Sequence, residues 1–209
     1  YVWADHYYDG MTLMTKSYSK FMGMDSQTQK PSIGMKWIEK SFSKGISVSK
    51  VEASGIGSGG VPVLIGETGI PFDMNAGDHK PLFFSRQRPT AFQTGDFSTC
   101  TNALNRTLCS MDESQMSYTI WCYQPDNTNE YGDGWNGEDL SLFSKSQVIE
   151  GDEDNLYAGG RSLEAAIRPY PQRVAGDVTH YAFQLYRKDR RFDLTFTSDH
   201  SLETNETTV

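Results

Sequence analysis

The sequence has few cysteines, few histidines and no long apolar run. Cys100, Cys109 and Cys122 form no Cys-x-x-Cys pair and have no histidine at metal-ligand spacing, which excludes the usual zinc sites and disulfide frameworks. We therefore expect free thiols in a reducing compartment, no metal and no other cofactor. No apolar stretch is long enough to span a membrane.

Positive charge is also scarce, because 19 Lys and Arg residues face 27 Asp and Glu residues, for a net charge of −8. The basic residues form no long run, which argues against nucleic acid as a partner. The 209 residues suffice for one domain, or for one domain and part of another. Since the chain begins at Tyr1 rather than Met, we expect it to be a piece of a longer protein.

Apolar periodicity in the first part of the chain predicts the order strand, helix, strand, helix, strand. The strands are expected at residues 1–8, 61–65 and 118–123, and the helices at 32–48 and 96–111. The unbroken apolar run at 61–65 is typical of a parallel strand buried on both faces. Such alternation indicates a (β/α) barrel or a doubly wound sheet, in which active sites lie at the carboxyl ends of the strands.

The pattern changes after residue 125. A polar, glycine-rich loop is expected at 126–139 and a short helix at 161–168. From Tyr181 to Phe196 apolar and polar residues alternate around a charged turn, as in an antiparallel hairpin with one solvated face. This alternation predicts that a second, all-β domain begins at Gly176 and continues to Val209.

The sequence Gly66-Glu67-Thr68-Gly69 places a carboxylate directly after the apolar strand. Burying this charge is costly unless it is used, and the glycines allow other groups to come close, so Glu67 is a candidate site residue. A turn residue or half of an ion pair is the structural alternative. His6, Tyr8 and Trp121 occupy the ends of the other two strands. Taken singly, a histidine such as His6 is more often a surface or core residue than a site residue, and a tryptophan at a strand end is ordinarily core.

These motifs together resemble glycoside hydrolase family 5, specifically its endoglycoceramidase-like branch. His6-Tyr7-Tyr8, Gly66-Glu67-Thr68-Gly69 and Trp121 resemble the motifs at the ends of the sixth, seventh and eighth strands of that (β/α)8 barrel. The longer strings 65–75 and 123–139 look like fungal members that hydrolyse steryl β-glucosides and glucosylceramide. The resemblance implies that residues 1–175 are the C-terminal part of a TIM barrel catalytic domain, and that residues 176–209 begin a β-sandwich.

The resemblance also implies the chemistry. Retaining hydrolysis uses two carboxyl groups roughly 5 Å apart, and Glu67 resembles the one that attacks the sugar. Tyr8 would donate a hydrogen bond to it, His6 would lie against the sugar or the acid, and Trp121 would offer its flat face to the sugar ring. The sugar hydroxyls would be bound by polar residues of the loop, namely Asp126, Asn127, Asn129 and Glu130.

One element of the family pattern is missing. The acid/base Glu belongs to an Asn-Glu-Pro motif that precedes the nucleophile, and neither Asn129-Glu130 nor Asn205-Glu206 fits that motif. A barrel of this kind takes about 250 residues, so we expect this span alone to be inactive. The alternative is a non-catalytic, truncated product that binds carbohydrate or regulates another protein.

Four further expectations concern surroundings and partners. A glycolipid substrate implies transient contact with a membrane surface, and we expect an intracellular protein of the cytoplasm or vacuole. Phe83, Phe84, Phe92 and Phe97 form either core or an apolar wall for the lipid part of the substrate. The loop at 126–139 lacks the EF-hand spacing, so a solvated loop or a sugar contact is favoured over a calcium site.

Overall fold

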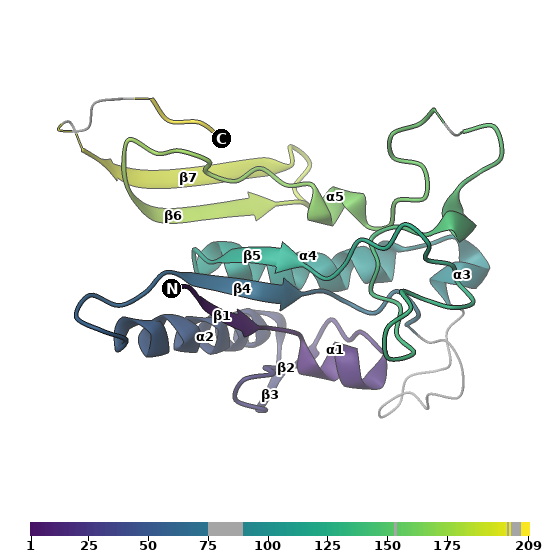
Figure 1. Cartoon of the computed structure of the whole chain (residues 1–209), viewed down its shortest axis with the longest axis horizontal. Coiled ribbons are helices and arrows are strands. Elements are labelled where there is room, and N and C mark those ends of the chain that lie inside the picture. The colour runs from purple at the N-terminus through teal and green to yellow at the C-terminus, as the bar shows by residue number, and fades with distance from the viewer. Residues whose placement is uncertain (75–89, 153, 200, 202–205) are drawn as a thin grey trace.

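The structure, a computed structural model, describes residues 1–74, 90–152, 154–199, 201 and 206–209. Its main sheet has three parallel strands in the order β1 (Trp3–His6), β4 (Val63–Thr68) and β5 (Ser117–Ile120). Helix α2 (Met35–Ser54) connects β1 to β4, and α4 (Ser98–Glu113) lies between β4 and β5 in the chain. The predicted alternation is confirmed. Because the strands are parallel, their carboxyl ends point to one side, where the following loops gather (Figure 1).

Helices α2 and α4 each bury one stripe of residues at intervals of three or four, as an amphipathic helix requires. In α2 the stripe is Ile38, Phe42, Gly45, Ile46, Ser49 and Ala53, and in α4 it includes Cys100, Ala103, Leu104, Leu108 and Met111. Both helices were predicted, although α2 starts later and runs to Ser54. None of the described helices has the length and apolar composition needed to cross a lipid bilayer.

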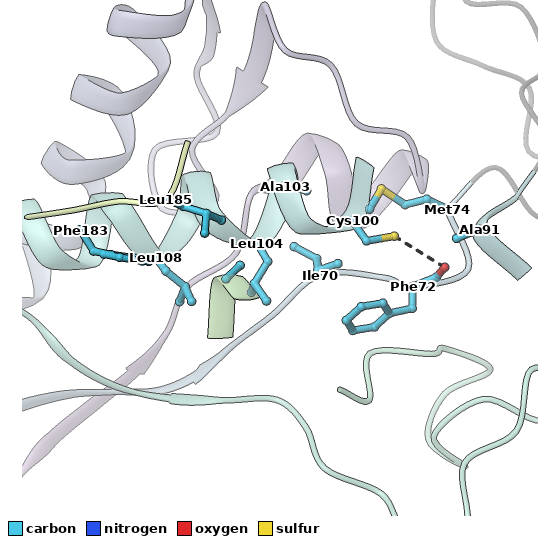
Figure 2. Close-up of a cluster of buried hydrophobic side chains, with 11 residues drawn as sticks. Ile70, Phe72, Met74, Ala91, Cys100, Ala103, Leu104, Leu108, Phe183 and Leu185 are labelled. Atoms are coloured by element: carbon cyan, nitrogen blue, oxygen red, sulfur yellow. Dashed lines mark hydrogen bonds between the residues drawn. The ribbon is translucent and has the colours of Figure 1, made fainter. Parts of the chain in front are cut away.

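The apolar core has two parts. Tyr7, Ile38, Phe42, Ile65 and Met111 belong to the first, where the sheet meets α2 and α4. The second joins the segment after β4 to α4 and to strand β6 (Figure 2), through residues that include Ile70, Phe72, Met74, Leu104, Leu108 and Phe183. Cys100 lies within this second part, and its thiol faces the carbonyl oxygen of Phe72. The chain that leaves β4 is therefore held against α4 by apolar burial.

Strands β6 (Gly176–Gln184) and β7 (Arg191–Ser198) form the antiparallel hairpin that the alternation predicts. The short helix α5 (Leu163–Ala166) precedes the hairpin. It lies within residues 161–168, where the sequence predicts a short helix. Phe183 and Leu185 pack in the same core as α4. The assignment of residues 176–209 to a separate β-sandwich domain stays a prediction.

Several short elements carry no periodic signal and were not predicted. They are α1 (Gly10–Thr15), β2 (Met22–Met24), β3 (Pro31–Ile33), α3 (Ala91–Thr94) and a 3₁₀ helix at Lys145–Gln147. A local cap stabilises α1, because the Asp9 carboxylate accepts hydrogen bonds from the backbone N–H groups of Met11 and Thr12. Asp9 also forms a buried ion pair with Arg106 of α4.

Candidate active site

The carboxyl ends of β1 and β4 lie side by side, so that His6 pairs with Glu67. The backbone N–H of Tyr7 donates to the carbonyl oxygen of Glu67 at 2.9 Å. Strand β4 continues to Thr68, past the predicted strand end at residue 65, because the chain segments on both sides form hydrogen bonds to its last residues. The prediction that this strand is buried on both faces is wrong in part, because Val63 and Leu64 are only half-buried.

The Glu67 carboxylate is contacted by two side chains from the end of β1. Its Oε2 meets Nδ1 of His6, and it accepts a hydrogen bond from the Tyr8 hydroxyl. Burial and the negative charge of Glu67 raise the pKa of that hydroxyl far above its ordinary value, so Tyr8 stays a proton donor at any physiological pH. The side chain of Glu67 is 18 % exposed and that of His6 63 %. A carboxylate held in this way can act as a nucleophile, a base or an ion-pair partner.

Hydrogen bonds from the β2–β3 hairpin position the segment that carries His6 and Tyr8. The backbone N–H of Tyr8 donates to Oγ of Ser26 at 3.2 Å, and Nε2 of Gln27 donates to the carbonyl oxygen of His6 at 3.2 Å. Asp9, which follows Tyr8 in the chain, forms an ion pair with Arg106. The two donors to Glu67 are therefore positioned by contacts on both sides of the chain.

Trp121 immediately follows β5, and its backbone N–H donates to the carbonyl oxygen of Thr68 at 2.7 Å. A side chain at Gly69 would place its Cβ 2.2 Å from the carbonyl oxygen of Trp121, so only glycine permits this approach. The peptide bond between Trp121 and Cys122 is cis. The indole is half-buried and lies at the same sheet edge as Glu67, as the sequence predicts for strand ends.

Three further charged side chains surround this edge. Lys16, at the end of α1, forms an ion pair with Asp73, and each side chain is 16 % exposed. Glu138 lies close enough to Glu67 and Lys16 for both charges to affect its pKa. Burial first, and then the negative charges of Asp133, Asp73 and Glu67, raise the pKa of Glu138, whereas Lys16 opposes the increase. Lys16, Asp73 and Glu138 were not singled out from the sequence.

The polar loop is organised around Arg161, which is fully buried. Nη1 of Arg161 donates to Oδ1 of Asp139 at 2.7 Å, and Nη2 donates to the amide oxygens of Asn127 and Asn129, each at 3.0 Å. The Asn127 amide nitrogen in turn donates to Asp139 at 2.8 Å. Burial raises the pKa of Asp139, and the bonds from Arg161 and Asn127 oppose that rise.

Asp126 and Glu130 occupy different surroundings from the two asparagines. Both are exposed, and Asp126 forms a surface ion pair with Lys145 at 2.5 Å. Within the part of the chain that the structure describes, no group of three or more His, Cys, Asp or Glu residues is arranged to hold a metal ion. Sugar binding by Asp126, Asn127, Asn129 and Glu130 stays a prediction.

Phe92 and Phe97 are half-buried and pack with Phe72 against the guanidinium of Arg161, whose centre lies 5.2 Å from the Phe92 ring and 5.9 Å from the Phe97 ring. These contacts agree with the prediction that Phe92 and Phe97 are core residues, rather than a wall for the lipid part of the substrate. Phe83 and Phe84 lie outside the described residues.

Arg161 is the residue that sequence reasoning missed most clearly. It stands alone near the start of a predicted short helix, and no motif connects it to the loop at 126–139. Glu138 carried a weak signal, since it falls within the loop string that resembles the fungal glycosidases. The three thiols are free, as predicted, with Cys100 buried and the other two half-buried.

The chain resembles curated fungal proteins. It is 31% identical over 198 residues to a glucosylceramidase of Cryptococcus neoformans, covering 87% of this chain and 24% of that protein. It is 36% identical over 151 residues to the ergosteryl-beta-glucosidase of Saccharomyces cerevisiae, covering 68% of this chain and 18% of that protein. The chain therefore spans about a quarter or less of these relatives' length. No family model matches the chain.

A solved structure agrees with these relatives. The crystal structure of Cryptococcus neoformans sterylglucosidase 1 with tris superimposes with a TM-score of 0.72 and 30% sequence identity. The match covers 92% of this chain and 28% of the crystallised one. Over most of its length, the chain is a homologue of fungal glucosylceramidases and steryl glucosidases, of which it represents a part.

Proposed function

We propose that this chain forms the carboxyl-terminal part of the active site of a retaining β-glucosidase that hydrolyses steryl β-glucoside, glucosylceramide or both. β1, β4 and β5 would be the last three strands of a (β/α)8 barrel. The observation that carries the proposal is the Glu67 carboxylate, which meets His6 and Tyr8 at the carboxyl edge of parallel strands. The names of the relatives support the glycolipid substrate.

In the proposed reaction, a carboxylate oxygen of Glu67 attacks the anomeric carbon of glucose. The bond to the aglycone oxygen breaks, its electron pair stays on that oxygen, and a second carboxylic acid protonates it. Water, deprotonated by the same second group, then hydrolyses the glucosyl ester. That second carboxyl group would come from a part of the barrel that this chain does not contain, so the chain alone would release no glucose.

The neighbours of Glu67 have distinct tasks in this reaction. The Tyr8 hydroxyl stabilises the ionised carboxylate before attack, and His6 orients it from the side of Oε2. Trp121 would present an apolar face to the C–H side of the sugar ring. Glu130 is exposed and would reach sugar hydroxyls directly, and Asp126 would exchange its ion pair with Lys145 for such a contact. Asn127 and Asn129 would act through the loop that they share with Arg161.

The test uses a chimera in which this chain replaces the matching part of the Cryptococcus neoformans glucosylceramidase. A 2-deoxy-2-fluoroglucosyl fluoride carries a leaving group that departs without protonation, so it traps the glucosyl-enzyme of a retaining enzyme. We expect one fluoroglucosyl unit on the peptide that contains Glu67. Glu67→Gln should prevent both trapping and glucose release.

The matched control is Glu52→Gln, because Glu52 is an exposed carboxylate on α2 and has no proposed role in sugar binding. It should leave trapping intact. A fluoroglucosyl unit on any other residue, or equal trapping in the Glu67→Gln variant, would remove Glu67 from the nucleophile role. Thermal unfolding of each variant verifies that the protein is folded.

A non-catalytic, carbohydrate-binding product is the second candidate, because Trp121 and the polar loop around Arg161 would allow sugar binding without a second carboxyl group. Titration of the unmodified chain with octyl β-glucoside below its critical micelle concentration, followed by Trp fluorescence, separates the two. Tight binding by the chain alone, together with a chimera that is never trapped, would favour the binding protein.

A further inference from the structure

Exposed apolar side chains lie on the β2–β3 hairpin and the first turn of α2. Figure 1 draws this hairpin below α2. The four side chains are those of Phe21 (61 % exposed), Ile33 (72 %), Met35 (44 %) and Trp37 (67 %). We refer to these four residues as the hairpin patch. Exposing several large apolar side chains on neighbouring segments is costly in water, so a group of this kind indicates an interaction surface.

Backbone contacts bring the segments that carry the four residues of the hairpin patch together. The carbonyl oxygen of Phe21 accepts from the N–H of Gly34 at 2.8 Å, and the N–H of Trp37 donates to the carbonyl oxygen of Gly34 at 3.0 Å. Gly34 has a φ of +94°. A Cβ atom added to it would lie 3.5 Å from the Trp37 ring. This turn lets α2 begin directly after β3, which places Ile33, Met35 and Trp37 within one short stretch.

The surroundings of the hairpin patch are basic in a chain whose net charge is −8. Between residues 20 and 44 there are five lysines and only two acidic residues, and one of the two, Asp25, is fully buried. Nζ of Lys40 lies 5.9 Å from the centroid of the Trp37 ring. An aromatic residue with neighbouring lysines is the composition that membrane–water interfaces select, because the ring enters the headgroup region while the ammonium groups meet anionic lipid.

The hairpin is also connected to the candidate site. Its turn residues Ser26 and Gln27 bond to the backbone of Tyr8 and His6. The strands β2 and β3 are three residues long, so the hairpin patch lies about 10 Å along the hairpin from that turn. A surface that docks on the patch would lie close to the edge where Glu67 stands.

We propose that the hairpin patch docks this protein on an anionic lipid surface. The proposal rests on the proposed function, since an enzyme that acts on a glycolipid must reach its substrate in a membrane. Phe21 and Trp37 insert at the level of the lipid headgroups. Lys36 and Lys40 attract the negative lipid charges, and salt weakens this attraction.

Vesicle sedimentation tests the proposal on the full chain. We expect binding to phosphatidylcholine vesicles that contain about one-third phosphatidylserine, and much weaker binding to phosphatidylcholine alone. The double variant Phe21→Ser with Trp37→Ser should lose binding at least about tenfold. The double variant Lys36→Gln with Lys40→Gln should lose binding about twenty-five-fold, since each lysine near such a surface contributes about fivefold.

The matched control is the double variant Ile149→Ser with Leu156→Ser, because these two side chains are 70 % and 88 % exposed and lie outside the patch. It should bind as the unmodified chain does. Brominated lipids should quench tryptophan fluorescence, and Trp37→Phe should remove that quenching while Trp135→Phe, at a second exposed tryptophan, retains it.

Equal binding of the patch variant and the control would overturn the proposal, as would absence of binding to anionic vesicles. Two other occupants have readouts of their own. In sedimentation equilibrium, a dimer that disappears in the patch variant and does not bind vesicles would assign the patch to a second copy of the chain. Vesicle binding by the chain that is lost in the chimera would assign the patch to the rest of the barrel. Failure here is distinguishable from failure of the proposed function. Trapping of Glu67 in the chimera uses a soluble glucosyl fluoride and needs no membrane, and vesicle binding needs no intact Glu67.

Discussion

The Tyr8 hydroxyl donates a hydrogen bond to the Glu67 carboxylate from the neighbouring strand end. A hydrogen bond to a charged group contributes about 1.5–3 kcal/mol. In the proposed enzyme, Tyr8→Phe should therefore slow fluoroglucosyl trapping of the chimera by about tenfold to a hundredfold. Tyr123→Phe is the control, because Tyr123 is 69 % exposed and should leave the rate unchanged. Equal rates in the two variants would show that the bond does not assist the reaction.

Gly69 permits the close approach of β4 to the chain after β5. Gly69→Ala places a methyl group 2.2 Å from the carbonyl oxygen of Trp121, so the backbone must shift. We expect the free energy of unfolding, measured in urea, to fall by about 1–3 kcal/mol. Gly59→Ala should be neutral or slightly stabilising, because its Cβ would meet no atom within 4 Å. A Gly69→Ala chain as stable as the unmodified one contradicts this reasoning.

Arg161 is the centre of the loop network, and its removal leaves the Asp139 carboxylate without its charged partner. Arg161→Met should lower the free energy of unfolding by about 3–5 kcal/mol, since breaking one side of a buried ion pair strands the other charge. Arg161→Lys should recover only part of the loss, because an ammonium group cannot span Asp139 and the two asparagines as the guanidinium does.

The control for Arg161 is Arg190→Met. Arg190 and Glu164 form an ion pair at 3.0 Å in which both side chains are about half exposed or more, at 62% and 49%. Such pairs contribute about 0–1 kcal/mol, so this variant should be close to the unmodified chain in the same urea titration. Similar decreases in the free energy of unfolding for Arg161→Met and Arg190→Met would show that burial of the ion pair does not determine the effect of breaking it.

The three thiols should react slowly in the folded chain. Burial raises the pKa of Cys100 to about 12 and, together with the nearby carboxylates, that of Cys122 to about 12, and burial also raises the pKa of Cys109. Because the thiolate is the nucleophile, a pKa of 12 leaves about one thiolate in ten thousand at pH 8. Alkylation followed by mass spectrometry at pH 8 should modify all three thiols in urea and far fewer without it. Rapid native modification of Cys100 would contradict its burial.

Much of the fold follows from local patterns. The stripe that includes Ile38, Phe42 and Ile46 predicts α2, and the alternation around Tyr181 and Phe183 predicts the β6–β7 hairpin, because each pattern matches the period of its element. The edge of the sheet that carries His6, Glu67 and Trp121 is also predictable, because the carboxyl ends of parallel strands share one side. The short elements α1, β2 and β3 are not, since three to six residues contain no full period.

The sequence by itself determined the alternating strand and helix order, the free thiols and the candidate status of Glu67, because these depend on residue type and spacing along the chain. Only the tertiary structure decided that Arg161 holds Asn127 and Asn129, that β4 runs through Glu67 to Thr68, and that Phe21 and Trp37 share an exposed patch. These relationships depend on which distant backbones pair and on how deeply each side chain is buried. Desolvation and hydrogen bonding between distant segments have no counterpart in the local pattern.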